Sequence, residues 1–86
     1  MTKKILVVED DENLVNLLRI YLVKDGYEVH CVKNGKNIMQ VIKTFEPDAI
    51  LLDWMLPDIE GIELCRQIRF EHDFPIIMIS ARTDEL

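Results

Sequence analysis

Three short apolar runs recur along the chain, and each has the character of a β-strand in a buried sheet. The first, Ile5–Val8, is an unbroken stretch rich in β-branched residues, which is typical of a strand covered on both faces. The runs that start at Ala49 and Ile76 have the same character. We therefore predict strands over about 5–8, 49–52 and 76–79, and a further short strand over 28–32.

An amphipathic helix is predicted between the first two strands, over about 12–25. Gly26 stands where the C-cap of such a helix belongs, because glycine accepts the backbone conformation that ends helices. Apolar residues recur there at three- and four-residue steps, as one face of a helix requires. That face is formed by Leu14, Leu17, Leu18, Tyr21 and Leu22.

Two further helices are predicted in the remaining gaps. One is expected over about 38–45, ending before Pro47, and the other over about 60–70. Strands and helices then alternate along the whole chain with short connections. This order predicts an α/β fold, a doubly wound parallel sheet with right-handed crossovers and helices on both faces.

Length and composition restrict the class of protein. At 86 residues the chain holds one small domain, 1–86, and its net charge of −6 argues against duplex DNA or an anionic membrane as a direct partner. No apolar run approaches the roughly 20 residues that span a bilayer, and the N-terminus lacks a signal-peptide pattern. Cys31 and Cys65 have no metal or disulfide spacing, so we interpret both as small core residues of a cytoplasmic protein.

Acidic residues follow two of the predicted strands. Glu9, Asp10 and Asp11 come directly after the first strand, and Asp53 ends the third. In open parallel sheets the ligand crevice lies beyond the carboxyl ends of the strands, where the strand order reverses. If the order is 2-1-3-4, the reversal falls between the first and third strands, and these acids would converge there.

Carboxylates gathered in one crevice raise one another's pKa unless a cation neutralises them. Oxygen ligands of this kind suit Mg²⁺, whereas zinc prefers histidine or cysteine ligands. Neither His30 nor His72 lies in a metal-ligand spacing. Two plainer interpretations stay open at this point. The acids after the first strand could simply occupy a helix N-terminus, where the macrodipole favours them, and Asp53 could be a solvated residue at a strand end.

Three blocks of sequence together resemble the receiver domain of two-component response regulators. They are Val7-Val8-Glu9-Asp10-Asp11, Leu51-Leu52-Asp53-Trp54-Met55-Leu56-Pro57 and Ile79-Ser80-Ala81, in the order and at the separations usual in that family. The resemblance implies a flavodoxin-like (CheY-like) sheet of order 2-1-3-4. The residues of the second block further resemble the OmpR/PhoB-like class, in which the receiver controls a winged-helix DNA-binding domain.

The resemblance implies a phosphorylation switch rather than a turnover enzyme. Asp53 would take a phosphoryl group from a sensor histidine kinase in a Mg²⁺-dependent reaction and so control a downstream output such as transcription. Ser80 would be the switch hydroxyl, and Ala81 would offer its backbone N–H to the phosphoryl group. The implied metal ligands are Asp10 and Asp53 by their side chains, Met55 by its backbone carbonyl, and Glu9 through water.

The chain ends where a complete receiver would continue. Leu86 lies just beyond the fourth strand, so the fourth helix, the fifth strand with its lysine and the fifth helix have no counterpart here. We expect the fourth strand, Ile76–Ile79, to be an open edge, and one face of the sheet to keep only its first helix. The 86-residue chain is therefore expected to self-associate through that edge.

Two other functions compete with this interpretation. A phosphatase of the haloacid dehalogenase type also uses an aspartate after a buried strand together with Mg²⁺, but it needs a second acid two residues on, where this chain has Met55. A fragment without the lysine could instead act as a phosphorylation-independent interaction or oligomerisation module. Loss of the pocket acids would mark such a module, and Glu9, Asp10 and Asp53 are all present.

Overall fold

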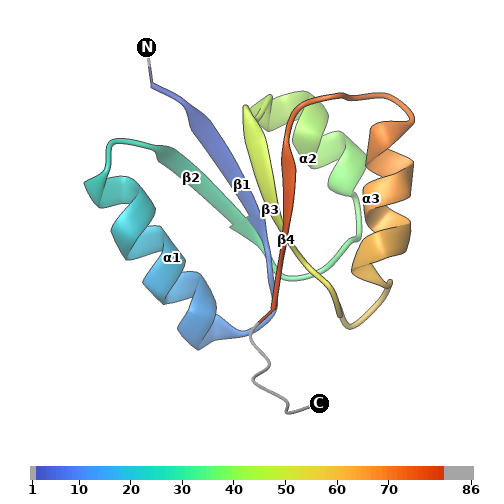
Figure 1. Ribbon diagram of the computed structural model, residues 1–86, viewed down its shortest axis with the longest axis horizontal. Helices are drawn as coiled ribbons and strands as arrows, with labels where there is room; N and C mark the ends of the chain where they lie inside the picture. The colour runs from blue at the N-terminus through green and yellow to red at the C-terminus, as the bar shows by residue number, and fades with distance from the viewer. Residues whose placement is uncertain (1, 81–86) are drawn as a thin grey trace.

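The computed structural model, which describes residues 2–80, contains one parallel sheet of four strands (Figure 1). The order across the sheet is β2-β1-β3-β4, as predicted. The end of β1 pairs with both neighbours, Val8 lying opposite Val32 on one side and Leu52 on the other. The strands are β1 (Lys4–Val8), β2 (Glu28–Val32), β3 (Ala49–Asp53) and β4 (Ile76–Ile79).

Within residues 2–80 three helices connect the strands, and they cover the two faces of the sheet unequally. Helix α1 (Glu12–Lys24) lies on one face, while α2 (Ile38–Phe45) and α3 (Gly61–Arg69) lie on the other (Figure 1). The first and third helices are slightly shorter than predicted, which is the usual fraying of helix ends. No helix within residues 2–80 has the length and hydropathy that a bilayer crossing would require.

The hydrophobic core lies between the sheet and the α2/α3 pair. Alternate residues of the strands point to this face, where they meet the inner sides of both helices. Burial of this one cluster is the main source of the fold's stability, because apolar burial is the dominant favourable term in folding. Its fully buried members are Leu6, Val8, Ile38, Ile42, Ile50, Leu52, Leu64 and Ile68.

Helix α1 packs more loosely than its sequence pattern suggested. None of its residues is buried, and Leu17 and Tyr21, expected to face the sheet, are 51% and 60% exposed. Among the described residues α1 is the only helix on that face (Figure 1), so the flank of its apolar stripe has no second helix to pack against. Apolar surface on this face is therefore uncovered, as expected from the sequence.

Both ends of α1 follow the sequence signals. The Asp11 carboxylate caps the first turn by accepting a hydrogen bond from the Leu14 N–H at 3.1 Å. Gly26 adopts a φ of +95° directly after the helix, a conformation that side-chain-bearing residues rarely take. The cap fixes where the chain leaves β1, and so where the acids between β1 and α1 lie.

Candidate metal centre at the carboxyl edge of the sheet

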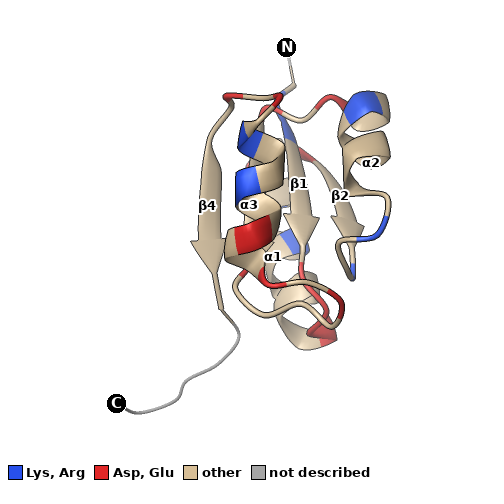
Figure 2. Ribbon diagram, turned by 90° about the vertical axis from the view of Figure 1, so that its right-hand side faces the viewer, with Lys and Arg blue, Asp and Glu red and all other residues tan. Residues whose placement is uncertain are grey.

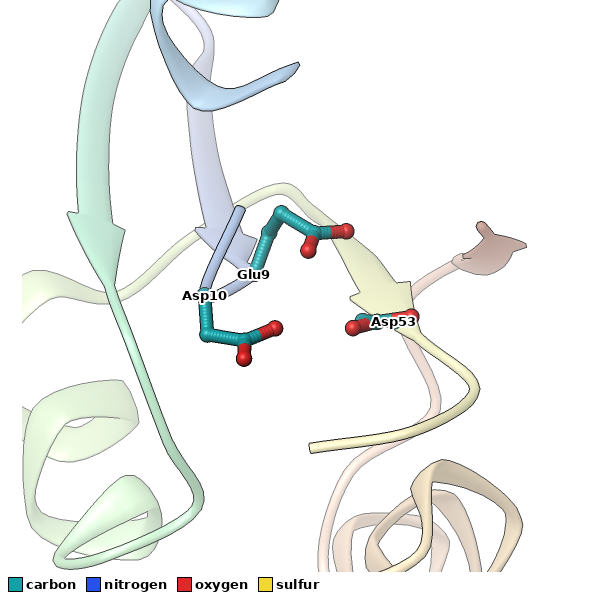
Figure 3. Close-up of side chains that lie close together, drawn as sticks. All are labelled: Glu9, Asp10 and Asp53. Atoms are coloured by element: carbon teal, nitrogen blue, oxygen red, sulfur yellow. The ribbon is translucent and has the colours of Figure 1, made fainter. Parts of the chain in front are cut away.

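Two adjacent strands deliver three carboxylates to one place. Glu9 and Asp10 follow the last residue of β1, and Asp53 is the last residue of β3. One carboxylate oxygen from each lies within 4.8 Å of the others, and Figure 3 shows the three side chains around a common space. The structure therefore brings these acids together at the point where the strand order reverses, as the sequence predicted.

The three acids differ strongly in burial. Glu9 is 1% exposed and Asp53 is 5% exposed, whereas Asp10 is open to solvent. Figure 2 shows acidic positions gathered in the loops at both ends of the strands, and Glu9 and Asp10 belong to the loop that follows β1. A ligand could thus reach the two buried carboxylates from the side on which Asp10 lies.

Glu9 is held by one hydrogen bond and left without another. Its Oε2 accepts the Asp11 N–H at 2.9 Å, while its buried Oε1 has no hydrogen-bond partner within the described part of the chain. Burial raises the pKa of Glu9 to about 7 against the opposing effect of the Asp11 N–H, and the neighbouring charges of Asp53 and Asp10 add to the increase. An orphaned buried carboxylate oxygen of this kind is unfavourable unless a proton or a cation satisfies it.

Asp53 is fixed by the loop that follows it. Its Oδ1 accepts the Met55 N–H at 3.2 Å, and the Trp54 N–H donates to the Ile79 carbonyl at 3.1 Å, which extends the pairing of β3 with β4. The Gly61 N–H donates back to the Trp54 carbonyl at 2.7 Å. These bonds close the β3–α3 loop (54–60) into a tight turn against the end of β3.

Gly61 is a site-supporting residue that the sequence analysis did not identify. A Cβ at this position would overlap the backbone carbonyl oxygen of Asp53, so no larger residue fits without moving the strand end. The only signal available was a glycine at the predicted start of a helix, where glycine has no propensity advantage over other residues. Its role becomes visible only once α3 is seen to begin against Asp53.

The remaining predicted site residues lie at the same edge where they are described. Asp53 is the register partner of Ile79, so Ser80 follows directly at the carboxyl end of β4 and is exposed. Met55 is 57% exposed and contributes its N–H to Asp53. Ala81 lies outside the described residues.

A hollow of about 250 Å³ adjoins the acids between the end of β2 and α1. The Lys33 Nζ lies 3.0 Å from a Glu12 carboxylate oxygen in an exposed ion pair beside it. Cys31, interpreted from sequence as a core residue, is a half-buried free cysteine that lines this hollow. Cys65 is also free and packs against the α2/α3 core.

The donor set of the cluster fits a hard divalent cation. It consists of carboxylate oxygens alone, with neither His30 nor His72 among its members. Such oxygens suit Mg²⁺, which keeps several waters and needs few protein ligands, whereas zinc prefers nitrogen and sulfur. The unsatisfied Oε1 of Glu9 and the three neighbouring negative charges are both features that a cation would relieve.

A model of the response regulator receiver domain family matches residues 5–86 of the chain. The chain belongs to this family. Among solved structures, this receiver is 35% identical to the BeF3-activated N-terminal receiver domain of Klebsiella pneumoniae RstA, with a TM-score of 0.88 over 96% of this chain and 71% of that one. It is 38% identical to the N-terminal domain of the nisin resistance regulator NsrR, a lantibiotic response regulator, with a TM-score of 0.84 over 100% and 73%.

A third similar structure bears on the acidic centre. The response regulator TrrA of Thermotoga maritima, described in complex with Mg²⁺ and a beryllium fluoride, is 34% identical, with a TM-score of 0.85 over 95% of this chain and 72% of that one. The described receiver thus has the CheY-like flavodoxin fold. Its three acids, Glu9, Asp10 and Asp53, lie together at the carboxyl edge of that fold.

Proposed function

We propose that the chain is the phosphoacceptor receiver of a two-component response regulator, with Asp53 as the residue that becomes phosphorylated. The observation that carries this proposal is the meeting of Glu9, Asp10 and Asp53 within 4.8 Å at the strand-order reversal. Asp53 ends a buried strand, yet its carboxylate reaches a cluster that is open on the Asp10 side. A nucleophile needs this combination of fixed position and access.

The proposed reaction is a phosphoryl transfer from the phosphohistidine of a sensor kinase. A carboxylate oxygen of Asp53 attacks the phosphorus, a P–O bond forms, the P–N bond breaks, and the imidazole leaves with the bonding electrons. Protein contributes mainly position and charge stabilisation to such a transfer. The Met55 N–H, bonded to Asp53 Oδ1, holds the carboxylate in place.

Mg²⁺ would be held by Asp10 and Asp53 side chains and the Met55 carbonyl, with Glu9 acting through water. When bound, it would neutralise the negative charge that builds up between the carboxylates and the phosphoryl group. The exposed Ser80 at the end of β4 would then donate its hydroxyl to a phosphoryl oxygen, and Ala81 its N–H.

The wider role follows from this chemistry. We propose a cytoplasmic switch that undergoes phosphorylation and dephosphorylation rather than a turnover enzyme, with a histidine kinase as its partner. Output would be transcriptional, as the resemblance of the Asp53 block to the OmpR/PhoB-like class implies. DNA would be bound by a domain outside this chain, because the net charge of −6 makes the receiver itself unsuited to DNA.

Acetyl phosphate with Mg²⁺, followed by intact mass measurement, tests the assignment. The chain is expected to gain one phosphoryl group, and the Asp53→Asn variant none. Asp48→Asn is the matched control, because Asp48 directly precedes the same strand at its opposite end. A phosphoryl group that persists in Asp53→Asn, or that is lost in Asp48→Asn alone, would contradict the assignment.

We also propose that the 86-residue chain associates with itself through β4. Within residues 2–80 this strand pairs with β3 alone, and Ile77 is 54% exposed. An open apolar edge strand is a template for pairing with another chain. Size-exclusion chromatography with light scattering at micromolar concentration is expected to show dimers or larger species that Ile77→Lys reduces; a clean wild-type monomer would exclude this association.

A further inference from the structure

One long-range hydrogen bond ties together two loops at the carboxyl edge. The Gly35 N–H, in the β2–α2 loop (33–37), donates to Asp58 Oδ1 at 2.9 Å, and Asp58 belongs to the β3–α3 loop. Neither residue is a member of the acid cluster. Both loops run at the same end of the sheet in Figure 1, beyond the strand that ends in Asp53.

Close packing accompanies this bond. A Cβ on Gly35 would lie 2.6 Å from the Ile59 Cγ2 and 3.3 Å from a Leu64 methyl, so the Gly35 backbone packs directly against the Ile59 side chain of the other loop and against Leu64 of α3. A real Cβ almost never approaches so closely, and glycine is therefore what allows the N–H to reach Asp58. The two loops are therefore joined by both a hydrogen bond and close packing.

The β3–α3 loop is the segment that holds Met55 against Asp53. Its base is closed by an antiparallel bridge between Met55 and Glu60 and by the Gly61 N–H to the Trp54 carbonyl. Asp58 lies in the segment that these two closures enclose, and its bond to Gly35 is a tether from the loop to the rest of the fold. Freeing the tether would let the Met55 backbone move relative to the carboxylates.

We propose that Asp58 is a positioning residue for the cation site, acting through Gly35 to hold the Met55 backbone at its place beside Asp53. This inference deepens the proposed function and rests on it for the identity of the cation. Asp58 acts as a hydrogen-bond acceptor, so an asparagine, which keeps the Oδ1 acceptor, is expected to serve nearly as well. Residues that support metal ligands through hydrogen bonds commonly change metal affinity when removed.

The test compares Asp58→Ala with two other variants of the 86-residue chain. Asp58→Asn keeps the acceptor and removes the charge. Asp48→Ala removes an equivalent bond at the opposite end of the sheet, where the Lys4 N–H donates to Asp48 Oδ2 at 2.7 Å. The readouts are the Mg²⁺ dissociation constant from Trp54 fluorescence, and amide hydrogen exchange of Gly35 and Met55 in metal-free protein.

Asp58→Ala is expected to weaken Mg²⁺ binding about 3- to 10-fold and to speed exchange at both amides, with Asp58→Asn and Asp48→Ala close to wild type. Unchanged affinity in Asp58→Ala, or equal weakening in Asp48→Ala, would overturn the positioning role. A wild-type chain that binds no Mg²⁺ would contradict the proposed function instead. In that case the exchange of the Met55 amide still decides the tether: a rate unaffected by Asp58→Ala would refute it.

Discussion

On the α2/α3 face of the sheet, buried apolar side chains from strands and helices meet, whereas at the carboxyl edge of β1 and β3 three carboxylates meet within 4.8 Å. The first region stabilises the fold through apolar burial, and the second opposes it through desolvated, like-charged groups. They nevertheless share a backbone, since Val8 and Leu52 of the core directly precede Glu9 and Asp53. The rigid packing of the core therefore holds the three carboxylates close together despite their mutual repulsion.

Matched leucine truncations give the largest expected effect. Leu64 on α3 is 1% exposed, and Leu17 on α1 is 51% exposed. Leu64→Ala should lower the free energy of unfolding by about 2–5 kcal/mol, because it leaves a cavity in the core, while Leu17→Ala should cost less than about 1 kcal/mol. Urea unfolding monitored by circular dichroism measures both. Equal losses would mean that α1 is as firmly packed as α3.

The pH dependence of stability probes the acidic edge. In metal-free buffer, Glu9 has a pKa of about 7 in the folded state against an ordinary value of 4.5, so the folded state binds more protons between those values. Stability should therefore fall as the pH rises from about 4.5 to about 7, by at most about 3 kcal/mol. Glu9→Gln should remove this part of the pH dependence.

Urea unfolding at several pH values in the presence of EDTA measures the difference in free energy of unfolding between wild type and Glu9→Gln. Other carboxylates contribute to the pH dependence of both proteins, so the difference isolates the contribution of Glu9. A difference that grows in the opposite direction, with wild type gaining stability over Glu9→Gln toward neutral pH, would show that Glu9 is stabilised as a carboxylate rather than as an acid.

A glycine pair separates close approach from backbone conformation. Gly61→Ala should cost about 1–3 kcal/mol, because its Cβ would overlap the Asp53 carbonyl and displace the strand end or α3. Gly26→Ala meets no atom within 4 Å but sits at a φ of +95°, so about 1 kcal/mol is expected. Only the Gly61 variant should also alter the Trp54 fluorescence of the folded protein. An unaltered spectrum would indicate that the added methyl group displaces α3 and leaves the end of β3 in place.

The residues themselves were sufficient for the strands, the helices and the three acids, because each has a local signal, whereas the sheet order came from the resemblance to the receiver family. Apolar runs and helical periodicity marked the elements, and the rule on strand ends located Glu9 and Asp53. The exposure of Leu17 could not be predicted from periodicity. Periodicity identifies the apolar face of a helix, but it does not tell how much of that face neighbouring elements bury. The contacts of Gly35 and Gly61 depend on loop positions in three dimensions, and nothing in the surrounding residues encodes those distances.

Bound Mg²⁺ should offset part of the destabilisation that the acidic edge imposes on the fold. At about ten times its dissociation constant, the cation should add roughly 1.4 kcal/mol to the free energy of unfolding. Because a proton on Glu9 competes with the cation for the same cluster, the gain at one fixed Mg²⁺ concentration should be larger at pH 8 than at pH 5. Thermal unfolding with and without Mg²⁺ at both pH values measures the gain, and Asp10→Asn should reduce it while leaving the metal-free protein folded, since Asp10 is exposed.

Calcium at equal occupancy is the control for charge alone. A gain that is the same at both pH values would indicate that Glu9 does not take part in holding the cation, and the acidic edge would then consist of a binding pair, Asp10 and Asp53, beside a buried acid that merely opposes folding.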